Sequence, residues 1–595
     1  MLRITSLLLL LILSLPVTRA EGSSPLAGHP SPYLRAHADD AVAWRADRSK
    51  AAAEALEANK PILLSSGYQS CYWCYRMKED SFSNRAVGEL VNSRFVPLLI
   101  DRELEPQLDA RLQRILEMQR GVGGWPANLV LTPGGYPVAA FGYAAPDDLL
   151  PALSQIAERQ ESAPERLVTE GKALLARLEN EREAADRMLT GVNLADLLQR
   201  FLQQASAAAD MEQGGFGDGE KYPHLPQLQA LLALTAVIPD ETLAAFTETT
   251  LDAMLERGLR DQIGGGFFRY TTDRQWRTPH FEQMLYTQAL AVQVLIRAAG
   301  QLGEQRYLDA GLATLDNMLR AFRRDDGLFR SSLSAVGRDG SDGGHYLWKA
   351  AELETALGPR WRSRIDVLAE TPAGLLPRLT PEATEAQRQA LLGLRESEPP
   401  PADDKALLGL NGLALSALSL ASGQQRFRQA GKRLADVLNR IAEDGAPARL
   451  IDRSDGGEAT LEDLVYAARG LADWSGSTRD DRAALNAAAL LRMAHARFHE
   501  ETSWLAGDLA PLPGNSRTPL IQDSQLPSPA ALWIDTAWRL AESSGEQELG
   551  RLADTLSLVW PQALYDNTFY HATGLAAMIE RRARGMAATR RGTAP

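Results

Sequence analysis

The sequence predicts a multidomain chain, with an α/β domain over residues 21–185 followed by an all-α domain over residues 186–580. Three observations predict this division. Short apolar strand patterns alternate with helical patterns in the first region. Helical patterns of 12 to 20 residues recur through the second region, separated by Gly, Pro and Asp-Gly breaks. A chain of 595 residues, 45% of them hydrophobic, is also long enough to bury more than one core.

The first 20 residues have the pattern of a secretory signal peptide. Arg3 supplies a positive charge, residues 7–15 form an apolar stretch, and residues 18–20 end in Ala20 as a cleavage site. The apolar stretch is shorter than a transmembrane helix needs. We therefore expect an exported protein, periplasmic if the cell is Gram-negative, without stable membrane insertion once the signal is cleaved. An uncleaved signal-anchor is the alternative.

The charge of the chain bears on its partners. The formal net charge is −13 at pH 7, which argues against nucleic acid as a partner. The basic residues cluster only at the C-terminus, where residues 581–595 carry several arginines. We expect this segment to be a solvated, flexible basic tail.

The elements of the first domain follow one another in a definite order. A strand pattern, "PILLSSG" (61–67), leads into "CYWC", and a helical pattern follows. A second strand pattern, "FVPLLIDRE" (95–103), precedes a further helix. The segment "GGWPANLVLTPGGYPVAAFG" (123–142) then predicts a loop, a strand, a tight turn and a returning strand. The order β, Cys-x-x-Cys, α, β, α, Pro, β-hairpin is that of a thioredoxin-like domain.

The chain contains only two cysteines, Cys71 and Cys74, on either side of Trp73. A Cys-x-x-Cys at a strand-to-helix junction places the first sulfur over free backbone N–H groups, which lowers the pKa of that thiol. We expect Cys71 to attack and Cys74 to resolve the mixed disulfide. Pro126, just ahead of a strand, is the candidate for a cis-proline facing the pair, and a trans turn proline is the alternative.

Neither a metal nor a cofactor is expected at the cysteine pair. A zinc site needs about four ligands, typically cysteine and histidine, and no histidine lies within the motif. The pair also has no distant cysteine with which to form a structural disulfide. One reactive thiol pair is the remaining interpretation.

Several segments, in order along the chain, resemble those of one family, the spermatogenesis-associated protein 20-like proteins. The resemblance implies a thioredoxin-like domain joined to an (α/α)6 toroid, similar in outline to N-acylglucosamine epimerases and six-hairpin glycosidases. The matching segments are "SPYLRAHADDAVAW" (31–44), "CYWCYRMKEDSF" (71–82), "IDRELEPQLD" (100–109), "GGWPANLVLTP" (123–133), "GGFGDGEKYPHL" (214–225), "DQIGGGFFRYTTDRQWRTPHFEQMLYTQAL" (261–290) and "DDKALLGLNGLALSAL" (403–418).

The cysteine box departs from the family at two positions. The family usually has histidines where this chain has Tyr72 and Tyr75. A neighbouring imidazolium can favour a thiolate or pass a proton, and a phenol does neither well at neutral pH. Simple thiol–disulfide exchange needs only the two sulfurs and the helix terminus, so it remains possible.

The helical patterns of the second domain alternate like helical hairpins. Such a series closes into a toroid or stacks as a solenoid, and periodicity alone does not decide between them. The resemblance implies the six-hairpin toroid. The predicted helices cover residues 191–207, 225–237, 242–258, 281–300, 304–323, 407–421, 425–442, 461–475, 480–498, 528–543 and 546–560.

Loops of the second domain gather polar and aromatic residues that suit a ligand cup at the centre of a toroid. Aromatic rings stack on sugars, and His and Glu can move protons. A glycosidase would need two carboxylates, for which Glu282 and Asp463 can be named, although the sequence does not fix their separation. The alternative is that His280 and Glu282 brace a loop. The candidate ligand-binding residues are Lys221, Arg269, Tyr270, Trp276, His280, Glu282, Asn411 and Asp463.

Three functions stay open from the sequence. The first is an exported thiol–disulfide oxidoreductase with a protein thiol or disulfide partner. The second is a carbohydrate-active or carbohydrate-binding toroid, acting on a small carbohydrate, with a structural thioredoxin-like domain. The third is a non-catalytic scaffold. The retained cysteine pair favours the first, the replaced histidines weaken it, and the aromatic loop around Trp276 favours the second.

Overall fold

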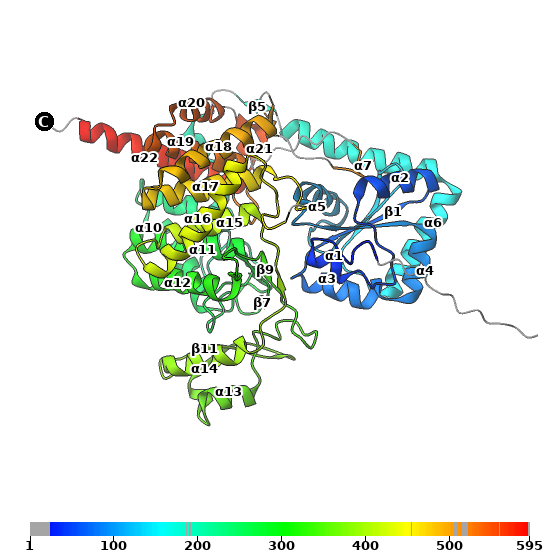
Figure 1. Cartoon of the computed structure of the whole chain (residues 1–595), viewed down its shortest axis with the longest axis horizontal. Helices are drawn as coiled ribbons and strands as arrows, with labels where there is room; N and C mark the ends of the chain where they lie inside the picture. Colours follow the sequence, from blue (N-terminus) through cyan, green and yellow to red (C-terminus); the bar gives the residue numbers. More distant parts are fainter. Residues whose placement is uncertain are drawn as a thin grey trace, which may run out of the picture.

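The fold is described from a computed structural model, which confirms an α/β domain followed by a helical domain (Figure 1). The predicted signal peptide lies outside the described residues. Within the described part of the chain, no helix has the length and apolarity needed to cross a membrane. The structure describes residues 24–185, 187–189, 192–453, 455–500, 503–504, 509–513, 522–558 and 560–592.

The first domain is built on a four-stranded sheet of order β2-β1-β3-β4. β1 and β2 are parallel, whereas β3 runs antiparallel to both β1 and β4. Every residue of β1 and β2 is buried, which is why both read as continuous apolar runs. The strands are β1 (Ile62–Gly67), β2 (Val96–Asp101), β3 (Ala127–Leu131) and β4 (Pro137–Phe141).

Helices cover both faces of this sheet. Leu63 packs with Val87 of α4 in one cluster, while Ile62 and Leu64 pack with Leu108 of α5 in another, because successive strand residues point to opposite faces. The helices are α1 (Pro32–Ala36), α2 (Arg48–Ala58), α3 (Tyr72–Met77), the π-helical turn η1 (Lys78–Phe82), α4 (Arg85–Arg94), α5 (Pro106–Arg120), α6 (Pro146–Ser162) and α7 (Pro164–Ala185).

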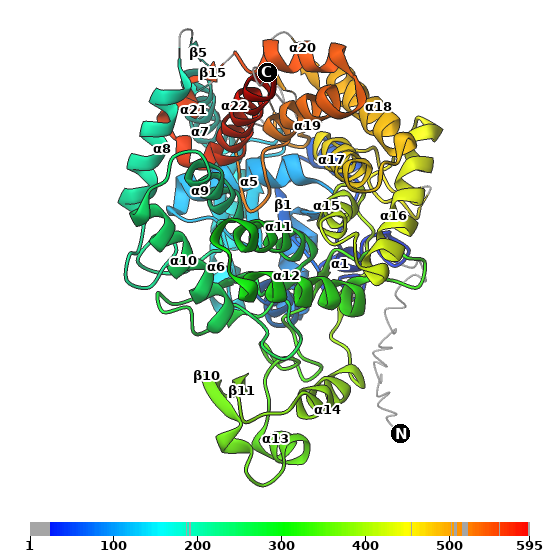
Figure 2. The ribbon, with the colours of Figure 1, turned by 90° about the vertical axis from the view of Figure 1, so that its left-hand side faces the viewer.

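The second domain is a closed ring of helical hairpins, seen from its end in Figure 2. In the inner ring, α9, α11, α15, α17, α19 and α22 each pack on the next, and α22 packs back on α9. This closure distinguishes a toroid from a solenoid. Five inner helices each pack against the outer helix that follows in the chain, and the last inner helix packs against α8: the pairs are α9 (Leu225–Thr235) with α10 (Glu241–Glu256), α11 (Leu285–Leu302) with α12 (Gln305–Asn317), α15 (Leu408–Ser419) with α16 (Gln425–Asp444), α17 (Leu461–Thr478) with α18 (Asp481–Phe498), α19 (Pro529–Ser544) with α20 (Gln547–Leu556), and α22 (Ala572–Gly592) with α8 (Leu194–Ala208).

The inner helix α15 and the outer helix α16 differ in how much of their surface is buried. Every residue of the inner helix α15 is buried, and its sequence is apolar on all sides. The outer helix α16 buries only one stripe, which includes Phe427, Leu434 and Leu438, and exposes charged residues elsewhere.

A small subdomain interrupts the ring between α12 and α15 and projects away from it (Figures 1 and 2). Its helices and an antiparallel hairpin share a core that includes Trp348, Leu353 and Leu391. The prediction of helices alone missed this hairpin, whose strands are partly exposed and short. The subdomain contains α13 (Ala350–Leu357), η3 (Trp361–Ser363), β10 (Ile365–Thr371), β11 (Gly374–Leu379) and α14 (Glu385–Glu396).

The remaining elements are short connections around the ring. They bring distant loops together in two-residue pairings, for example β5 with β15. They comprise β5 (Met188–Leu189), β6 (Tyr270–Thr271), β7 (Pro279–His280), β8 (Gln283–Met284), η2 (Met318–Phe322), β9 (Ser332–Leu333), β12 (Ala402–Asp403), β13 (His499–Glu500), β14 (Ser503–Trp504), β15 (Trp560–Pro561), α21 (Gln562–Asp566) and η4 (Thr568–His571).

The predicted flexible basic tail is, over most of its length, the end of a helix. α22 continues to Gly592. Arg581 forms an ion pair with Glu542 of α19, and Arg584 forms another with the same carboxylate at 2.8 Å. Arg581 and Arg584 are therefore held against α19, and the flexibility of the rest of residues 581–595 remains a prediction.

The two domains share a buried ionic cluster, which we call the Lys405 cluster. The Lys405 ammonium, from the loop before α15, pairs with Asp101 at the end of β2, with Glu103 at 3.1 Å and with Asp403 at 2.7 Å. The Ser31 hydroxyl donates a hydrogen bond of 2.6 Å to Asp101. The segments "IDRELE" and "DDKALLGL", distant in sequence, therefore meet at the domain interface.

Candidate functional site

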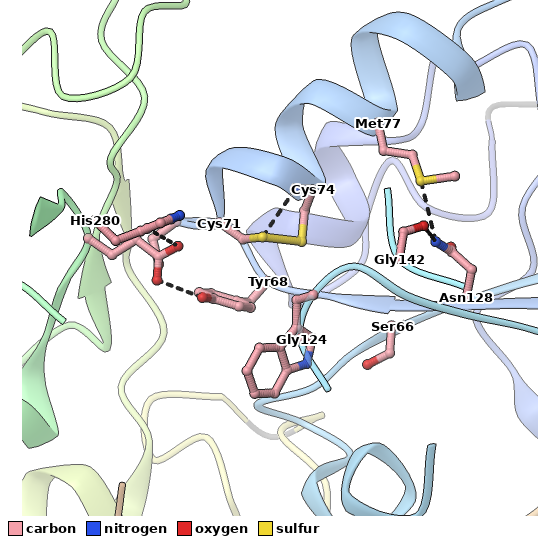
Figure 3. The surroundings of a disulfide bond; sticks show 12 residues. Ser66, Tyr68, Cys71, Cys74, Met77, Gly124, Asn128, Gly142 and His280 are labelled. Atoms are coloured by element: carbon pink, nitrogen blue, oxygen red, sulfur yellow. Dashed lines mark hydrogen bonds and ion pairs between the residues drawn. A yellow bond between two sulfur atoms is a disulfide. The ribbon is translucent and has the colours of Figure 1, made fainter. Parts of the chain in front are cut away.

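Cys71 and Cys74 form a disulfide at the start of α3 (Figure 3). Cys71 is the N-cap of this helix, with extended backbone angles, and the Cys74 N–H donates a hydrogen bond of 3.1 Å to the Cys71 sulfur. Both cysteines are buried, with 3% of Cys71 and 1% of Cys74 exposed. The strand-to-helix junction predicted from the sequence is confirmed, and the first sulfur lies at the helix N-terminus.

The end of β1 leaves room for the disulfide only because Gly67 has no side chain. A Cβ atom at this position would lie 2.9 Å from the Cys74 sulfur and would also clash with the Tyr33 ring. The strand therefore passes directly under the sulfur pair. Any larger residue at position 67 would displace the helix that carries the cysteines.

The loop before β3 forms a second wall of the site. The Trp125–Pro126 peptide bond is cis, as the sequence predicts. The Trp125 indole N–H donates to Asp109 of α5 at 3.0 Å, and the Ser66 hydroxyl donates to the same carboxylate at 2.6 Å. Burial raises the pKa of Asp109 above its usual value. The contribution of Pro126 to chemistry remains a prediction.

Trp73 lies on the outer side of the motif. Its side chain is exposed (46%), and its ring contacts the rings of Tyr72 and Tyr143 at centroid distances of 5.5 and 5.2 Å. A catalytic role for Trp73 also remains a prediction. Its position favours contact with solvent or a partner.

Loops of the toroid form the third wall, and they bring charged residues to the disulfide. The Tyr68 hydroxyl donates to Glu282 at 2.6 Å, and Arg269 contacts both this hydroxyl and, at 3.2 Å, the same carboxylate. His280 Nδ1 lies 3.3 Å from the other oxygen of Glu282. Figure 3 shows His280 on the toroid side of Cys71. We call Tyr68, Arg269, His280 and Glu282 the Glu282 cluster.

Other toroid loops cover the start of the motif. The Ala335 N–H donates to the carbonyl of Ser70, the residue before Cys71, at 3.3 Å. The Ser70 hydroxyl lies 3.7 Å from the Met284 sulfur. Gly340 also approaches closely, since a Cβ there would lie 2.8 Å from the Tyr75 hydroxyl. The disulfide is therefore enclosed between the two domains.

Some buried polar groups near this site have unused hydrogen-bonding capacity. Within the described residues, His280 Nδ1, Glu282 Oε1 and Asp342 Oδ1 make no hydrogen bond. Burial raises the pKa of Asp342 to about 6, and His280 partly opposes that rise. Among the described residues, no group of three or more His, Cys, Asp or Glu side chains could hold a metal ion. The unused atoms are thus suited to moving protons or binding a substrate.

Four of the eight predicted cup residues belong to this site or adjoin it. Arg269, His280 and Glu282 lie in the Glu282 cluster. The ring of Tyr270 stacks on His280 at a centroid distance of 5.0 Å, and Tyr222 stacks on Tyr270 at 4.5 Å. The dense polar and aromatic stretch in the sequence therefore places four of its residues in or beside the Glu282 cluster, and their role in ligand binding remains a prediction.

The other four predicted cup residues brace the toroid. Lys221 is fully buried and pairs with Asp210 at 2.9 Å. The Trp276 indole is buried and donates to the backbone at residue 213. Asn411 exchanges hydrogen bonds with the backbone of residue 329, and Asp463 caps α17 and pairs with an arginine at position 449. Each side chain has its full set of partners, so none points to a ligand.

One cavity at the cup, of about 150 Å³, lies beside Arg269. It is polar and aromatic, and burial lowers the pKa of His224 in its wall to about 4. Its wall includes Tyr222, His224, Arg269, Tyr286, Gln525 and Tyr570.

Sequence reasoning missed four residues of the site, namely Tyr68, Arg102, Asp109 and Asp342. Arg102 and Asp109 lie in the family-like segment "IDRELEPQLD", which contains no chemical motif of its own. Tyr68 lies just before the cysteines and reads as part of a strand end. Only their partners in the fold, far along the chain, give these residues a role.

The fold and site define a class: a thioredoxin-like domain with a Cys-x-x-Cys disulfide, closed by an (α/α)6 toroid. Residues 23–179 match the family described as "Thioredox_DsbH: Protein of unknown function, DUF255". The chain is 33% identical to mouse spermatogenesis-associated protein 20 over 351 residues, and 34% identical to the human protein over 346 residues. These matches confirm the resemblance to the spermatogenesis-associated protein 20-like family.

The matched regions are partial. They cover 56% and 55% of this chain, and 44% of the length of either relative. Among solved structures, a sugar epimerase from a ruminal bacterium is 10% identical, with a TM-score of 0.44, over 66% of this chain and 98% of its own. The GH76 α-mannanase of Bacteroides thetaiotaomicron is 8% identical, with a TM-score of 0.40, over 67% of this chain and 98% of its own.

Proposed function

We propose that the protein carries out thiol–disulfide exchange through Cys71 and Cys74. The observation that carries this proposal is the hydrogen bond from the Cys74 N–H to the Cys71 sulfur at the N-terminus of α3. When the disulfide is reduced, the same N–H and the positive end of the helix stabilise a thiolate on Cys71. The chain has no other cysteine, so the pair does not compete with a second disulfide partner.

The exchange proceeds in two steps. A substrate thiolate attacks the Cys71 sulfur, a new bond joins the two sulfurs, and the Cys71–Cys74 bond breaks with Cys74 leaving as a thiolate. A second substrate thiolate then attacks the substrate sulfur of the mixed disulfide and releases Cys71 as a thiolate. Two electrons pass from two substrate thiols to the protein disulfide, and the reverse sequence oxidises the protein thiols.

The toroid takes part by enclosing the pair. Because Cys71 is only 3% exposed, the surface of a folded partner does not reach it without movement of the loops. A small thiol or an extended segment is therefore the favoured substrate. Glu282 and His280, on the toroid side of Cys71, are the candidate acceptors for thiol protons. Export to the periplasm remains part of the proposal.

The test is the reduction potential of the Cys71–Cys74 pair in the mature protein, titrated against glutathione and read by thiol trapping. We expect a potential between about −120 and −270 mV, the range of exchange catalysts. A potential below about −300 mV would identify a structural disulfide and contradict the proposal.

A pair of single variants tests the order of attack. Incubated with oxidised glutathione, Cys74→Ser should accumulate a mixed disulfide on Cys71 while one glutathione leaves as a thiolate, because no resolving thiol remains. Cys71→Ser is the matched control and should accumulate much less, since Cys74 is the more deeply buried sulfur. Equal trapping on both variants would contradict the assignment of Cys71 as the attacked sulfur.

Carbohydrate binding in the cup is the second candidate function. It is favoured by the stacked rings of Tyr222, Tyr270 and His280 beside the small cavity. A glycosidase mechanism through Glu282 and Asp463 is not supported, because Asp463 is engaged by Arg449 and by the cap of α17. Calorimetric titration with monosaccharides tests this candidate. If a monosaccharide binds the unmodified protein and not Tyr270→Ala, the result supports carbohydrate binding. If no monosaccharide binds, the result contradicts it.

A further inference from the structure

Arg102 lies at the edge of the disulfide site with an unusual set of neighbours. Its backbone N–H donates to Gly67 at 2.9 Å, the residue that packs against the Cys74 sulfur. Its guanidinium lies 4.1 Å from the ring centroid of Tyr68 and 4.1 Å from that of Trp125, the residue before cis-Pro126. Cation–π contacts with two rings fix the guanidinium beside the redox pair.

The Arg102 guanidinium has no anionic partner. Within the part of the chain that the structure describes, Arg102 forms no ion pair, and its Nε is buried without a hydrogen bond. Asp109, whose pKa the Arg102 charge holds down against burial, accepts hydrogen bonds from Ser66 and Trp125, and Glu103 pairs with Lys405. Arg102 as a residue keeps part of its surface exposed, although its Nε is buried.

A second arginine adds to the positive charge at the same place. The Arg269 guanidinium lies 5.0 Å from the Trp125 ring and 5.6 Å from the Tyr68 ring, so both arginines share the two rings. Glu282 is the carboxylate that pairs with Arg269. Arg269 is thus paired with a carboxylate, whereas Arg102 forms no ion pair among the described residues, so its N–H donors can serve an additional anion.

We infer that the substrate of the exchange is a small thiol that carries a carboxylate, and that Arg102 binds this carboxylate. This inference rests on the proposed exchange at Cys71. A guanidinium presents a planar fork of N–H donors that matches a carboxylate through two hydrogen bonds. The carboxylate would anchor the substrate at the Arg102 guanidinium, beside the Tyr68 and Trp125 rings, with its thiol directed at the disulfide.

The experiment compares three small thiols as reductants of the disulfide. They are 3-mercaptopropionate, 2-mercaptoethanol and cysteamine, which carry an anion, no charge and a cation. Their second-order rate constants are measured by thiol trapping and corrected for the thiolate fraction and nucleophilicity of each thiol. We expect the intact protein to react about tenfold faster with 3-mercaptopropionate than with 2-mercaptoethanol, and slowest with cysteamine.

Variants of Arg102 assign this preference to one side chain. Arg102→Gln should abolish the preference, so that the ratio of the 3-mercaptopropionate rate constant to the 2-mercaptoethanol rate constant, both measured on this variant, falls about tenfold. Arg102→Lys should retain part of the preference. The matched control is Arg85→Gln, which removes the same charge from the exposed helix α4 and should leave the preference unchanged.

A measurement on the unmodified protein makes the test independent of variant folding. The methylated analogue 3-(methylthio)propionate has the carboxylate but no thiol, so it should slow reduction by 2-mercaptoethanol competitively. No preference among the thiols, or a preference that Arg102→Gln leaves intact, would overturn the inference while exchange itself persists. Failure of all three thiols to reduce the pair would instead overturn the proposed function, and the inference with it.

Discussion

Two charged clusters join the domains, and they differ in how completely their charges are paired. In the Lys405 cluster, one buried ammonium lies within ion-pair distance of three carboxylates from both domains. Around the Glu282 cluster, Arg102 and Asp342 have no ion pair among the described residues, and several buried atoms make no hydrogen bond. The first cluster joins the end of β2 to the loop before α15, and the second lies on the toroid side of Cys71.

We propose that this difference separates a cluster that holds the domains together from one that binds a substrate. A buried charge without a partner lowers the free energy of unfolding. Its presence in a folded protein is therefore a sign of a functional role. Removing a charge from the Lys405 cluster should therefore affect stability above all. Removing one from the Glu282 cluster should affect exchange above all.

The largest expected effect is on stability, from Lys405→Met. This variant keeps the apolar stem and removes the ammonium, leaving Asp101, Glu103 and Asp403 buried together. Burial raises the pKa of Asp403 to about 7 even though Lys405 opposes that rise, so loss of the ammonium leaves a still less favourable carboxylate. We expect a loss of about 3–5 kcal/mol in the free energy of unfolding, measured by denaturant titration.

The control for this prediction is Lys432→Met on α16, where the exposed ammonium pairs with Asp436 in solvent. Its cost should be below about 1 kcal/mol. If the two variants lost the same stability, the Lys405 cluster would not hold the domains together.

The second prediction concerns Glu282→Gln. The amide keeps an oxygen for the Tyr68 hydroxyl but removes the charge that pairs with Arg269 and faces His280. We expect the rate of disulfide reduction at pH 7 to fall about 10- to 100-fold, because the site loses its candidate proton acceptor. The free energy of unfolding should fall less than in Lys405→Met.

Glu89→Gln on the exposed surface of α4 is the matched control and should leave the rate unchanged. The outcome that contradicts the comparison is an unchanged rate together with a large loss of stability. That result would place the Glu282 cluster with the Lys405 cluster, as a structural contact.

The third prediction is a pH dependence at the cup, tested with His224→Asn. Burial lowers the pKa of His224 to about 4, below the ordinary value for histidine, so the folded protein keeps this ring neutral. Its contribution to stability is present above about pH 6.5 and is lost as pH falls towards 4. At pH 5 the burial of this ring lowers the free energy of unfolding by about 2 kcal/mol relative to pH 7.

Asparagine tolerates the positive φ of 43° at position 224, which makes it a suitable replacement. The free energy of unfolding of His224→Asn, relative to that of the unmodified protein, should therefore rise by about 2 kcal/mol as the pH falls from 7 to 5. Tyr222→Phe, in the same cavity wall, should show no such change. A constant difference across this pH range would show that His224 does not titrate with the expected pKa.

The smallest expected effect comes from Trp73→Ala. The indole lies inside the Cys-x-x-Cys motif but is largely exposed, so its removal should change the free energy of unfolding by less than about 1 kcal/mol. The rate of reduction by small thiols should change less than about threefold. A tenfold fall would show that Trp73 contacts the substrate, and the site would then extend to the outer face of α3.

By itself, the sequence determined the features that depend on nearby residues. The Cys-x-x-Cys at the start of a helix, the proline before β3 and the buried strands β1 and β2 follow from local patterns of apolar residues and caps. The recurrent helices of the second domain follow from the same periodicity. These elements could be predicted because their spacing is set within a few residues.

Only the tertiary structure decided which residues meet. The Tyr68 and Glu282 side chains are 214 residues apart in the chain, and the closure of the inner ring joins α22 to α9. For this reason the sequence did not distinguish Glu282, beside the disulfide, from Asp463, which caps a helix. It also gave no sign that Arg102 would lack a partner, because pairing of a buried charge depends on atoms that folding brings within a few ångströms.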